Sequence, residues 1–490
     1  MLDCPPPNPR TVRIQELDRL LERDADAFDA RFERAGLLRE QGRFEEAKRD
    51  YFDLLRRRPS DFGALNDFGT LVLTAGYKDA ARSLYAQAVR HHPDRPMGHV
   101  NLANLLFQMD EPELARAHYE TALRIDPEHR HAHRGMGNFL AECGDEAGAR
   151  RHRDKAFKNN FLTPLPYRGD RSGIAVLLLV SAAGGNIPTS TLLDDRYFRT
   201  TALVTEYYDP KIPLPPHDLV FNSIGDADLC RRGLEAACSV LARTGRPVIN
   251  HPLAVLKTGR AANANRLRGV AHLVTPRIAS VPRRLLAGPQ AAEAVARHGF
   301  AFPFLLRAPG FHTGRYFTRV DDPQSLAAAA AELPGDDVWL IEPLDARDGE
   351  GMHRKFRVMI VDGRLYPLHL AISRNWKVHY FKADMADNER NRLQDGAFLQ
   401  DMTAVVGALG VAALERINTT LALDYGGIDF GVDARGDILL FEANATMVMI
   451  PLMPDQKWAY RQPAFERVFA AVRAMLMDRA ASSRPVVQPA

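Results

Sequence analysis

The chain has 490 residues, more than one hydrophobic core can organise, so we expect two or three domains. Its apolar content of 46% and charged content of 26% describe an ordinary soluble globular protein. A formal net charge of +3 is close to balance for this length, so we expect no nucleic-acid partner.

Cysteine usage and apolar segments indicate the compartment. The four cysteines have neither the spacing of a zinc site nor the density of a disulfide scaffold, which favours a reducing environment. Residues 1–7 lack the charged and then apolar pattern of a signal peptide, and the longest apolar run, residues 174–180, is too short to cross a bilayer. We therefore expect a cytoplasmic protein with no membrane partner. The cysteines are Cys4, Cys143, Cys230 and Cys238.

The first third of the chain repeats itself every 34 residues. Small residues recur at Ala35, Gly69, Ala103 and Gly137, and alanines at Ala47, Ala81, Ala115 and Ala149. Aromatic residues recur at Tyr51, Tyr85 and Tyr119, and prolines at Pro59, Pro93 and Pro127. This pattern resembles the tetratricopeptide repeat, in which small residues let paired antiparallel helices touch and aromatics fill the gap to the next pair.

The ends of the repeat array depart from the pattern. Arg153 stands at the aromatic position of the last unit and Phe161 at the proline position, as expected where a stack of repeats ends. The segment around Ile14 to Arg23 is expected to form a helix that caps the other end. We therefore predict an all-α solenoid of about four repeats plus a capping helix over residues 1–161.

The resemblance implies a concave groove that binds a peptide or a protein segment. Asparagine and arginine side chains there could hold an extended backbone or a carboxylate. Two alternatives stay open: these are ordinary solvated helix residues, or the domain joins subunits, for example in a homodimer. The groove residues implied by the repeat positions are Asn66, Asn104, Arg134 and Asn138.

Residues 162–172 carry prolines and a glycine without periodicity and read as a linker. A small α/β subdomain is predicted over 173–258, with buried strands at 174–180, 218–222 and 247–250 and a helix over about 226–243. The first strand runs into a loop with Gly184 and Gly185, which is either a plain tight turn or a loop that contacts substrate.

The segment 429–444 reads as a β-hairpin that gathers oxygen ligands. With a two-residue turn at Arg435-Gly436, Asp429 lies directly opposite Glu442, and Asn444 shares the face of Glu442 because strand side chains alternate. Opposed carboxylates destabilise a sheet unless a cation lies between them, and carboxylates with an amide oxygen suit Mg²⁺ that also holds phosphates. The alternative is a surface hairpin with scattered acids.

Several segments before this hairpin follow an order that resembles the ATP-grasp superfamily, the fold of glutathione synthetase, D-alanine ligase and the ligases that add glutamate to a protein C-terminus. The resemblance implies an α+β ATP-grasp domain over 259–480, after the small α/β subdomain and before a disordered tail at 481–490. It also implies ATP and Mg²⁺, or Mn²⁺, as cofactors, with Asp429, Glu442 and Asn444 as metal ligands. The segments are 248–252, 259–260, 273–276, 302–307, 309–314 and 338–344.

The resemblance also implies nucleotide-binding residues. Arg260 and Arg307 stand where lysine is common in the family, and arginine can bind phosphate bidentately but with a different geometry. Arg357 is predicted to stabilise charge on an acyl phosphate and Lys355, on the same strand face, to contact the ATP phosphates; the alternative is a solvated strand face. The remaining nucleotide positions are Gly310 and Gly314 of a flexible phosphate cover, and Glu342, Leu344 and Glu350.

The run 365–381 is dense in aromatic, histidine and cationic side chains and follows the basic strand. It is a candidate acceptor site in which Arg374 grips a substrate carboxylate and His369 or His379 accepts a proton from an amine, with Trp376 beside them. Each histidine could instead be a satisfied core residue. No third ligand at metal spacing is present, so a zinc site is not expected.

Two classes of function remain from the sequence. In the first, an ATP- and Mg²⁺-dependent ligase joins a small-molecule carboxylate to an amine through an acyl phosphate, and the repeats bind a peptide or protein. In the second, the chain is an interaction scaffold whose nucleotide domain does not ligate. A phosphotransferase is a further variant of the enzyme.

Overall fold

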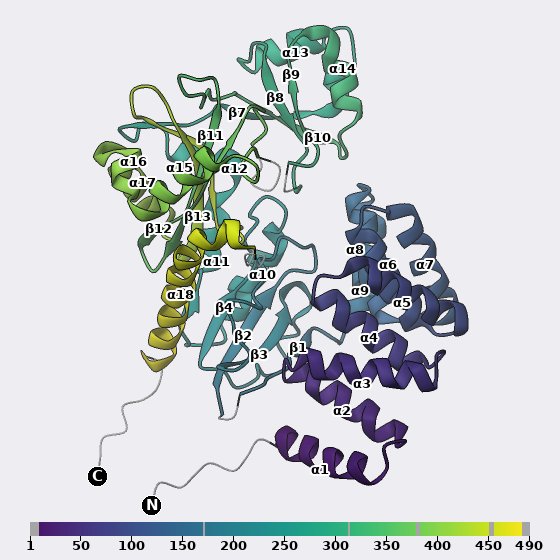
Figure 1. Cartoon of the computed structure of the whole chain (residues 1–490). Coiled ribbons are helices and arrows are strands. Elements are labelled where there is room, and N and C mark those ends of the chain that lie inside the picture. The colour runs from purple at the N-terminus through teal and green to yellow at the C-terminus, as the bar shows by residue number, and fades with distance from the viewer. Residues whose placement is uncertain (1–8, 170–171, 312–313, 379–382, 450–454, 483–490) are drawn as a thin grey trace, which may run out of the picture. The chain divides into compact units, whose positions relative to one another are not determined.

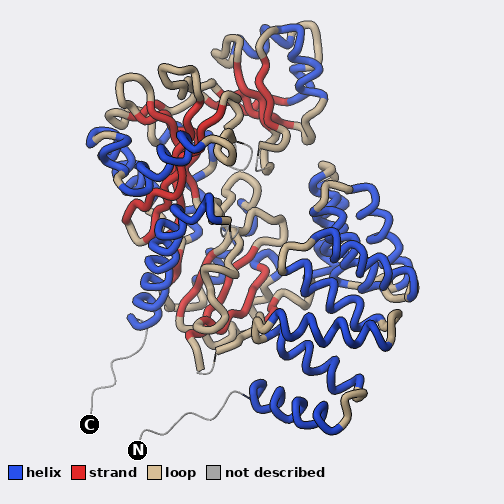
Figure 2. Tube along the Cα trace, in the orientation of Figure 1, coloured by secondary structure: helices blue, strands red, loops and turns tan. Residues whose placement is uncertain are grey.

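The structure is a computed structural model that describes residues 9–169, 172–311, 314–378, 383–449 and 455–482 (Figure 1). The chain divides into two compact units. The first comprises residues 1–160, 165–173 and 195–199, and the second comprises 161–164, 174–194 and 200–490. Helices make up the first unit, whereas the second mixes strands and helices (Figure 2). The protein is therefore multidomain, with an all-helical N-terminal region followed by an α/β region with mixed sheets.

In the first unit, short turns join antiparallel helices into the pairs α2/α3, α4/α5, α6/α7 and α8/α9, and α1 packs on α2. The expected helix at 14–23 is confirmed and begins earlier, at Pro9. The helices are α1 Pro9–Arg23, α2 Phe28–Glu40, α3 Phe44–Arg57, α4 Phe62–Thr74, α5 Lys78–His91, α6 Pro96–Gln108, α7 Pro112–Ile125, α8 Arg130–Glu142 and α9 Glu146–Phe157.

The repeated small and aromatic residues form the contacts that the period predicts. Ala35, Ala47 and Tyr51 are fully buried, and Tyr85 and Tyr119 are buried in the same way one and two repeats on. A Cβ added at Gly69 would lie 2.6 Å from the Tyr85 ring, so the glycine makes room for the aromatic residue. The repeat therefore rests on close helix contacts that larger side chains would disrupt.

Two histidine pairs recur one repeat apart in this unit. Nδ1 of His99 lies 3.0 Å from Nδ1 of His118, and Nδ1 of His133 lies 2.9 Å from Nδ1 of His152. The Nε2 atoms of His99 and His133 bond the carbonyl oxygens of Pro93 and Pro127, which can only accept. In the neutral rings His99 and His133 must therefore accept at Nδ1 from their partners.

We expect these pairs to make the stability of the repeats depend on pH. Burial, followed by the facing histidine, lowers the pKa of both His118 and His152 below the ordinary 6.5. Between the folded and unfolded pKa values the unfolded chain binds more protons, so this contribution is complete above pH 6.5 and is lost as the pH falls.

Far-UV circular dichroism during heating follows the unfolding of the helices. Tryptophan fluorescence follows the second unit separately, because all three tryptophans lie in that unit. The Tm of the helical transition should fall between about pH 7.5 and about pH 5.5. The double variant His118→Gln/His152→Gln should reduce this dependence, whereas replacing the exposed His91 by glutamine should not. An equal pH dependence in all three proteins would contradict the assignment.

The second unit contains a five-stranded sheet in the order β1-β3-β2-β4-β5, whose strands β2, β4 and β5 are parallel. The predicted strand at 174–180 is confirmed as β2. The predicted helix at 226–243 is shorter, α10 Arg231–Leu241, because Asp226 accepts hydrogen bonds from the backbone N–H groups of Asp228 and Leu229 in a turn before it. The strands are β1 Leu162–Pro164, β2 Ile174–Val180, β3 Phe198–Val204, β4 Leu219–Asn222 and β5 Val248–Ile249; η1 is Thr205–Tyr207.

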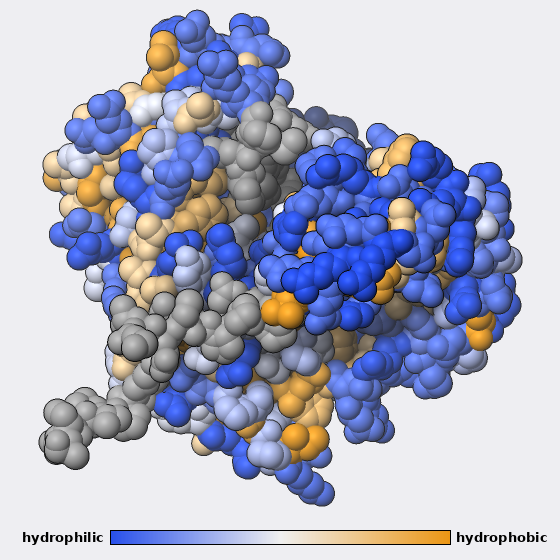
Figure 3. All heavy atoms as spheres, turned by 60° about the horizontal axis from the view of Figure 1, so that its bottom comes forward, coloured by the Kyte–Doolittle hydropathy of each residue, from blue (hydrophilic) through white to orange (hydrophobic). Residues whose placement is uncertain are grey.

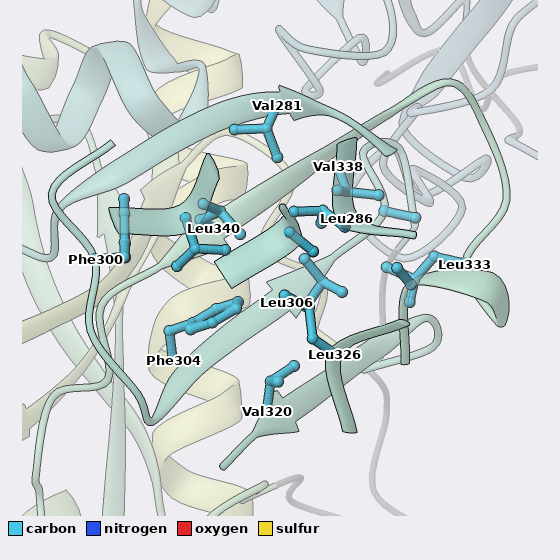
Figure 4. Packing of buried hydrophobic residues seen from close by; sticks show 14 residues of the cluster. Val281, Leu286, Phe300, Phe304, Leu306, Val320, Leu326, Leu333, Val338 and Leu340 are labelled. Carbon is cyan, nitrogen blue, oxygen red and sulfur yellow. The ribbon is translucent and has the colours of Figure 1, made fainter. Parts of the chain in front are cut away.

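A four-stranded antiparallel sheet, in the order β7-β10-β8-β9, encloses its own apolar cluster (Figure 4). Phe304 and Leu306 of β8 point into this cluster, so strand alternation turns Arg307 to the opposite face. The elements are β7 Ile278–Pro282, η3 Arg283–Leu286, α13 Ala291–Arg297, β8 Phe304–Arg307, β9 Phe317–Val320, α14 Pro323–Ala331 and β10 Asp337–Ile341.

A third sheet has the order β12-β11-β13-β14-β6, and only the β14–β6 pair is parallel among its described strands. Its strands are β6 Leu273–Val274, β11 His353–Val361, β12 Arg364–Ser373, β13 Tyr425–Val432 and β14 Ile438–Asn444. The remaining elements are α11 Pro252–Val255, η2 Leu256–Thr258, α12 Arg260–Arg266, α15 Glu389–Gln400, α16 Met402–Val406, α17 Ala408–Leu421, η5 Gln456–Arg461 and α18 Gln462–Ser482.

Within the described ranges, none of these helices is long and apolar enough to cross a membrane. Hydrophilic side chains cover most of the face drawn in Figure 3, and hydrophobic ones form only small groups.

The hairpin β13–β14 has the predicted partner residues but a different turn. Asp433 accepts hydrogen bonds from the backbone N–H groups of Arg435 and Asp437, which closes a longer loop after the last pair, Val432–Ile438. The predicted two-residue turn at Arg435-Gly436 is therefore wrong. A bulge at Phe441 shifts the register back by one residue, and Asp429 lies opposite Glu442 as predicted.

Candidate functional site

A pocket in the second unit lies where its three sheets contribute loops and strand ends. The loop after β4, the start of α12, the end of β8, Trp339 of β10 and the strand β14 line it. Loops at the carboxyl ends of parallel strands are the usual binding edge of an α/β sheet, and the loop after β4 lies at that edge. Its polar and aromatic lining residues are Asp226, Asp228, Thr258, Arg260, Asn263, Arg307, Phe311, Trp339, Phe441, Glu442 and Asn444.

Arg260 is held at the start of α12 by bonds to three residues that line the pocket. Its backbone N–H donates to Asp228 Oδ2 at 2.8 Å. Its Nη1 donates to the carbonyl oxygen of Phe441 at 3.2 Å, and its Nη2 lies 2.7 Å from Glu442 Oε1. Because Phe441 is the extra residue of the bulge, its carbonyl is available to the guanidinium. The side chain is only 12% exposed, so its position is well defined.

Arg307 is a buried cation whose polar atoms are only partly satisfied. The residue is 8% exposed, and its Nη2 donates to the carbonyl oxygen of Phe311. Its Nε has no hydrogen-bond partner among the described residues. Burial, with a further contribution from Arg260, lowers the pKa of the guanidinium to about 10, so it remains charged at neutral pH. Because no described carboxylate forms an ion pair with this buried cation, Arg307 is a candidate residue for binding an anion.

The two acids of the hairpin are ionised and are neutralised by neighbouring cations. Burial raises the pKa of Glu442, but Arg260 and Arg307 outweigh it and lower the value to about 2. Asp429 is 1% exposed, and Arg357 and Lys355 hold its pKa far below the ordinary range against the effect of burial.

Lys355 and Arg357 lie on the same face of β11, as predicted, and both contact Asp429. Arg357 binds the carboxylate bidentately, with Nε 2.6 Å from Oδ1 and Nη2 2.8 Å from Oδ2. Lys355 Nζ lies 2.6 Å from Oδ2. Arg357, Asp429 and Glu442 stand in direct register across three strands. Two carboxylates opposed across strands repel each other, and the cations that offset this repulsion are therefore side chains of the protein itself.

The predicted metal ligands are two carboxylates and an amide, which are chemical types that suit Mg²⁺. Asn444 Nδ2 donates to Glu442 Oε1 at 2.8 Å, which brings these two side chains together. Asn444 Oδ1 accepts from the backbone N–H and the hydroxyl of Thr446. Over the ranges described, no group of three histidine, cysteine, aspartate or glutamate side chains is arranged to hold a metal. The donor types therefore fit the metal, while in this structure Asp429, Glu442 and Asn444 are bonded by donors of the protein.

The other predicted nucleotide residues are scattered. Gly310 lines the pocket with a φ of 78°. Gly314 packs against Lys377, Glu342 accepts the backbone N–H of Arg277, and Glu350 forms an exposed ion pair with Arg390. Leu344 is half-buried. Four of the predicted nucleotide residues are therefore not among the described residues that line the pocket. They are Gly314, Glu342, Leu344 and Glu350.

The predicted acceptor residues that the structure describes differ in their exposure. His369 is buried opposite Arg357, and burial followed by the charge of Arg357 holds its pKa well below 6.5. Arg374 is exposed, and Trp376 packs edge-on against Phe317. His379 lies outside the described residues. The structure therefore brings Trp376 to the strand that follows the glycine-rich loop and leaves Arg374 in solvent.

The predicted groove residues of the first unit differ in their availability. Asn66 accepts from Asn101 Nδ2 at 2.7 Å, and Asn104 accepts from the Tyr119 hydroxyl at 2.7 Å. These two asparagines therefore have partners within the repeats. Arg134 and Asn138 are exposed on α8 and can contact a bound segment.

Sequence reasoning missed several lining residues. Asp226 and Asp228 follow β4, and Asn263 Nδ2 donates to the carbonyl oxygen of Ala443 at 2.6 Å, tying α12 to the hairpin. Trp339 is 9% exposed beside Arg260. Two acids in the loop that follows a buried parallel strand were a signal that could have identified this edge of the pocket.

Comparison with known proteins identifies the repeats. The tetratricopeptide repeat family matches residues 14–64, 66–130 and 100–156, so the N-terminal region consists of these repeats. MamA from Desulfovibrio magneticus RS-1 is 18% identical over 30% of this chain and 83% of its own, with a TM-score of 0.28. A thermophilic TPR protein of Thermus thermophilus is 17% identical over 30% and 81%, with a TM-score of 0.27. No curated protein matches the chain.

Proposed function

We propose that the second unit is an ATP-grasp domain that binds ATP with Mg²⁺ and activates a carboxylate for ligation to an amine. The observation that carries this proposal is the pocket in which Arg260 and the partly satisfied Arg307 face Glu442 and Asn444. A polyphosphate would supply an anion for Arg307, which has no ion-paired carboxylate among the described residues, and would compete with Glu442 for the neighbouring Arg260. Apolar and aromatic lining residues, among them Ile278, Trp339 and Leu440, suit a nucleobase.

The side chains of the chain have distinct roles in this reaction. Arg307 and Arg260 would bind phosphate oxygens through their N–H groups, and Lys355 would contact the transferred phosphoryl group. Glu442, Asn444 and Asp429 would hold Mg²⁺, which neutralises phosphate charge when bound. Arg357, in register with Asp429, would stabilise charge on the acyl phosphate. Loop residues around Gly310 would limit the access of water to that intermediate.

The repeats then have the role of bringing a protein or peptide to this unit. Tetratricopeptide repeats form extended concave surfaces that bind polypeptide segments, which supports a peptide or protein partner. A small-molecule carboxylate or amine would be the second substrate.

A second candidate is an interaction scaffold whose pocket binds nucleotide without ligation. The observation in its favour is that both hairpin acids are engaged by cations of the protein, Asp429 by two and Glu442 by Arg260. A phosphotransferase would use the same pocket and yield a phosphorylated product.

ADP and AMP release, measured with Mg²⁺, ATP and an extract of small metabolites and peptides, tests the proposal. We expect extract-dependent ADP release that falls roughly 100-fold in Glu442→Gln, because that variant loses a metal ligand. The control Glu466→Gln makes the same chemical change on the exposed face of α18 and should keep the wild-type rate. Nucleotide binding without turnover would favour the scaffold, and a phosphorylated product would mark a phosphotransferase.

A further inference from the structure

The proposed metal ligands Asp429 and Glu442 are already bonded by other side chains of the protein. Both oxygens of Asp429 are bonded by Arg357, and Lys355 shares one of them. Glu442 Oε1 lies 2.7 Å from Arg260 Nη2 and 2.8 Å from Asn444 Nδ2. A bare divalent cation must therefore displace Arg260 to bind Oε1 of Glu442, and must displace Arg357 or Lys355 to bind Asp429.

The ion pair between Arg260 and Glu442, called the latch below, holds one proposed metal ligand in place. The backbone N–H of Arg260 is fixed by Asp228, its Nη1 by the carbonyl oxygen of Phe441, and its Nη2 by Glu442. A planar guanidinium bridges the carbonyl and the carboxylate at once, which a lysine ammonium on a flexible stem would do less well. The arginine at this position therefore ties a metal ligand to the bulge beside it.

A polyphosphate can open this latch, whereas a metal ion alone meets only repulsion from it. Arg260 and Arg307 line the same pocket, and the Nε of Arg307 has no hydrogen-bond partner among the described residues. Phosphate oxygens entering between the two arginines would accept hydrogen bonds from the Arg260 N–H groups that now bind Glu442. Removing the guanidinium from Glu442 would expose a carboxylate next to an anionic ligand, which is the arrangement that a divalent cation stabilises.

We propose that Arg260 makes metal binding conditional on the nucleotide: the phosphates take the Arg260 guanidinium, and only then does Glu442 become a metal ligand. This inference rests on the proposed function, because it concerns the order in which the same site is filled. The pocket binds the polyphosphate before the metal, or the two together, and does not bind the metal first.

Binding of Mn²⁺ alone, followed by electron paramagnetic resonance of the free ion, tests the latch without any turnover. Full-length wild type should bind Mn²⁺ weakly, and Arg260→Gln should bind it at least about tenfold more tightly because Glu442 is released. The double variant Arg260→Gln/Glu442→Gln should lose that gain, which ties it to this carboxylate. Arg268→Gln, an exposed arginine just after the same helix, should bind like wild type.

Equilibrium binding of the β,γ-imido analogue of ATP in the presence of EDTA completes the test. Wild type should bind the analogue without metal, and Arg260→Gln should bind it less tightly. Equal Mn²⁺ affinity in wild type and Arg260→Gln would overturn the latch while leaving nucleotide binding, and hence the proposed function, intact. Failure of wild type to bind the analogue with or without Mg²⁺ would instead overturn both.

Discussion

Replacing Arg357 by methionine is expected to lower the free energy of unfolding of the second unit by about 3 kcal/mol, since breaking a buried ion pair costs roughly 3–5 kcal/mol and Lys355 remains as a partner. The change removes both bidentate bonds to a carboxylate that is 1% exposed. Urea unfolding followed by tryptophan fluorescence measures the loss, because every tryptophan lies in this unit.

The control for this prediction also removes the Asp429 carboxylate, which has lost its Arg357 partner. In Arg357→Met/Asp429→Asn the buried carboxylate is gone, so we expect at least half of the lost stability to return. Arg357→Lys keeps a positive charge but cannot form the two parallel bonds of the guanidinium, so its free energy of unfolding should lie between those of wild type and Arg357→Met. If Arg357→Met unfolded at the wild-type urea concentration, the ion pair between Arg357 and Asp429 would not contribute to the stability of the fold.

The repeat domain was predictable because its signal is local and repeated. Ala35 and Gly69 recur at the one spacing that brings paired helices into contact, and Tyr51 and Tyr85 fill the adjacent gap. Each unit confirms the next, so one irregular position does not change the interpretation. The histidine pairs were not predicted, although His99 and His133 are one period apart, because their partners lie on the opposite helix of each pair.

The hairpin shows how a correct pairing can follow from a wrong turn. The prediction placed the turn at Arg435-Gly436, whereas the side chain of Asp433 organises a longer loop. This error of one residue is cancelled by the bulge at Phe441, so Asp429 still faces Glu442. Sequence alternation identifies which side chains share a face, but bulges depend on neighbouring strands that the local sequence does not specify.

The ion pairs of the candidate site were the least predictable part. Arg260 was interpreted as a phosphate contact, yet it is bonded to Glu442, which lies far along the chain in the hairpin. For His369 the sequence left open a proton acceptor or a core residue, and its strand places it in the buried row next to Arg357. Such contacts arise between elements that are distant in sequence, and a motif read along one strand cannot reveal them.

Arg307→Met should change stability and binding in opposite directions. Burial holds the pKa of this guanidinium at about 10 rather than 12.5, a difference worth roughly 3 kcal/mol against the charged folded state at about 1.4 kcal/mol per unit. An apolar side chain of similar length removes that cost, so we expect the urea midpoint to rise by an amount equivalent to about 2 kcal/mol. The same change removes the buried cation that the phosphates would meet, so affinity for the ATP analogue should fall about 100-fold.

The opposite signs separate a functional cation from a structural one. Removing a purely structural arginine would lower stability and leave binding by the folded protein unchanged, whereas removing a binding cation that is kept at a cost to the fold raises stability and lowers binding. Arg319→Met, on the exposed side of the neighbouring strand β9, changes the same chemical group without touching the pocket and should alter neither quantity. If Arg307→Met instead lost stability while binding the analogue with wild-type affinity, Arg307 would be part of the fold, and the anion site would have to be sought elsewhere in the second unit.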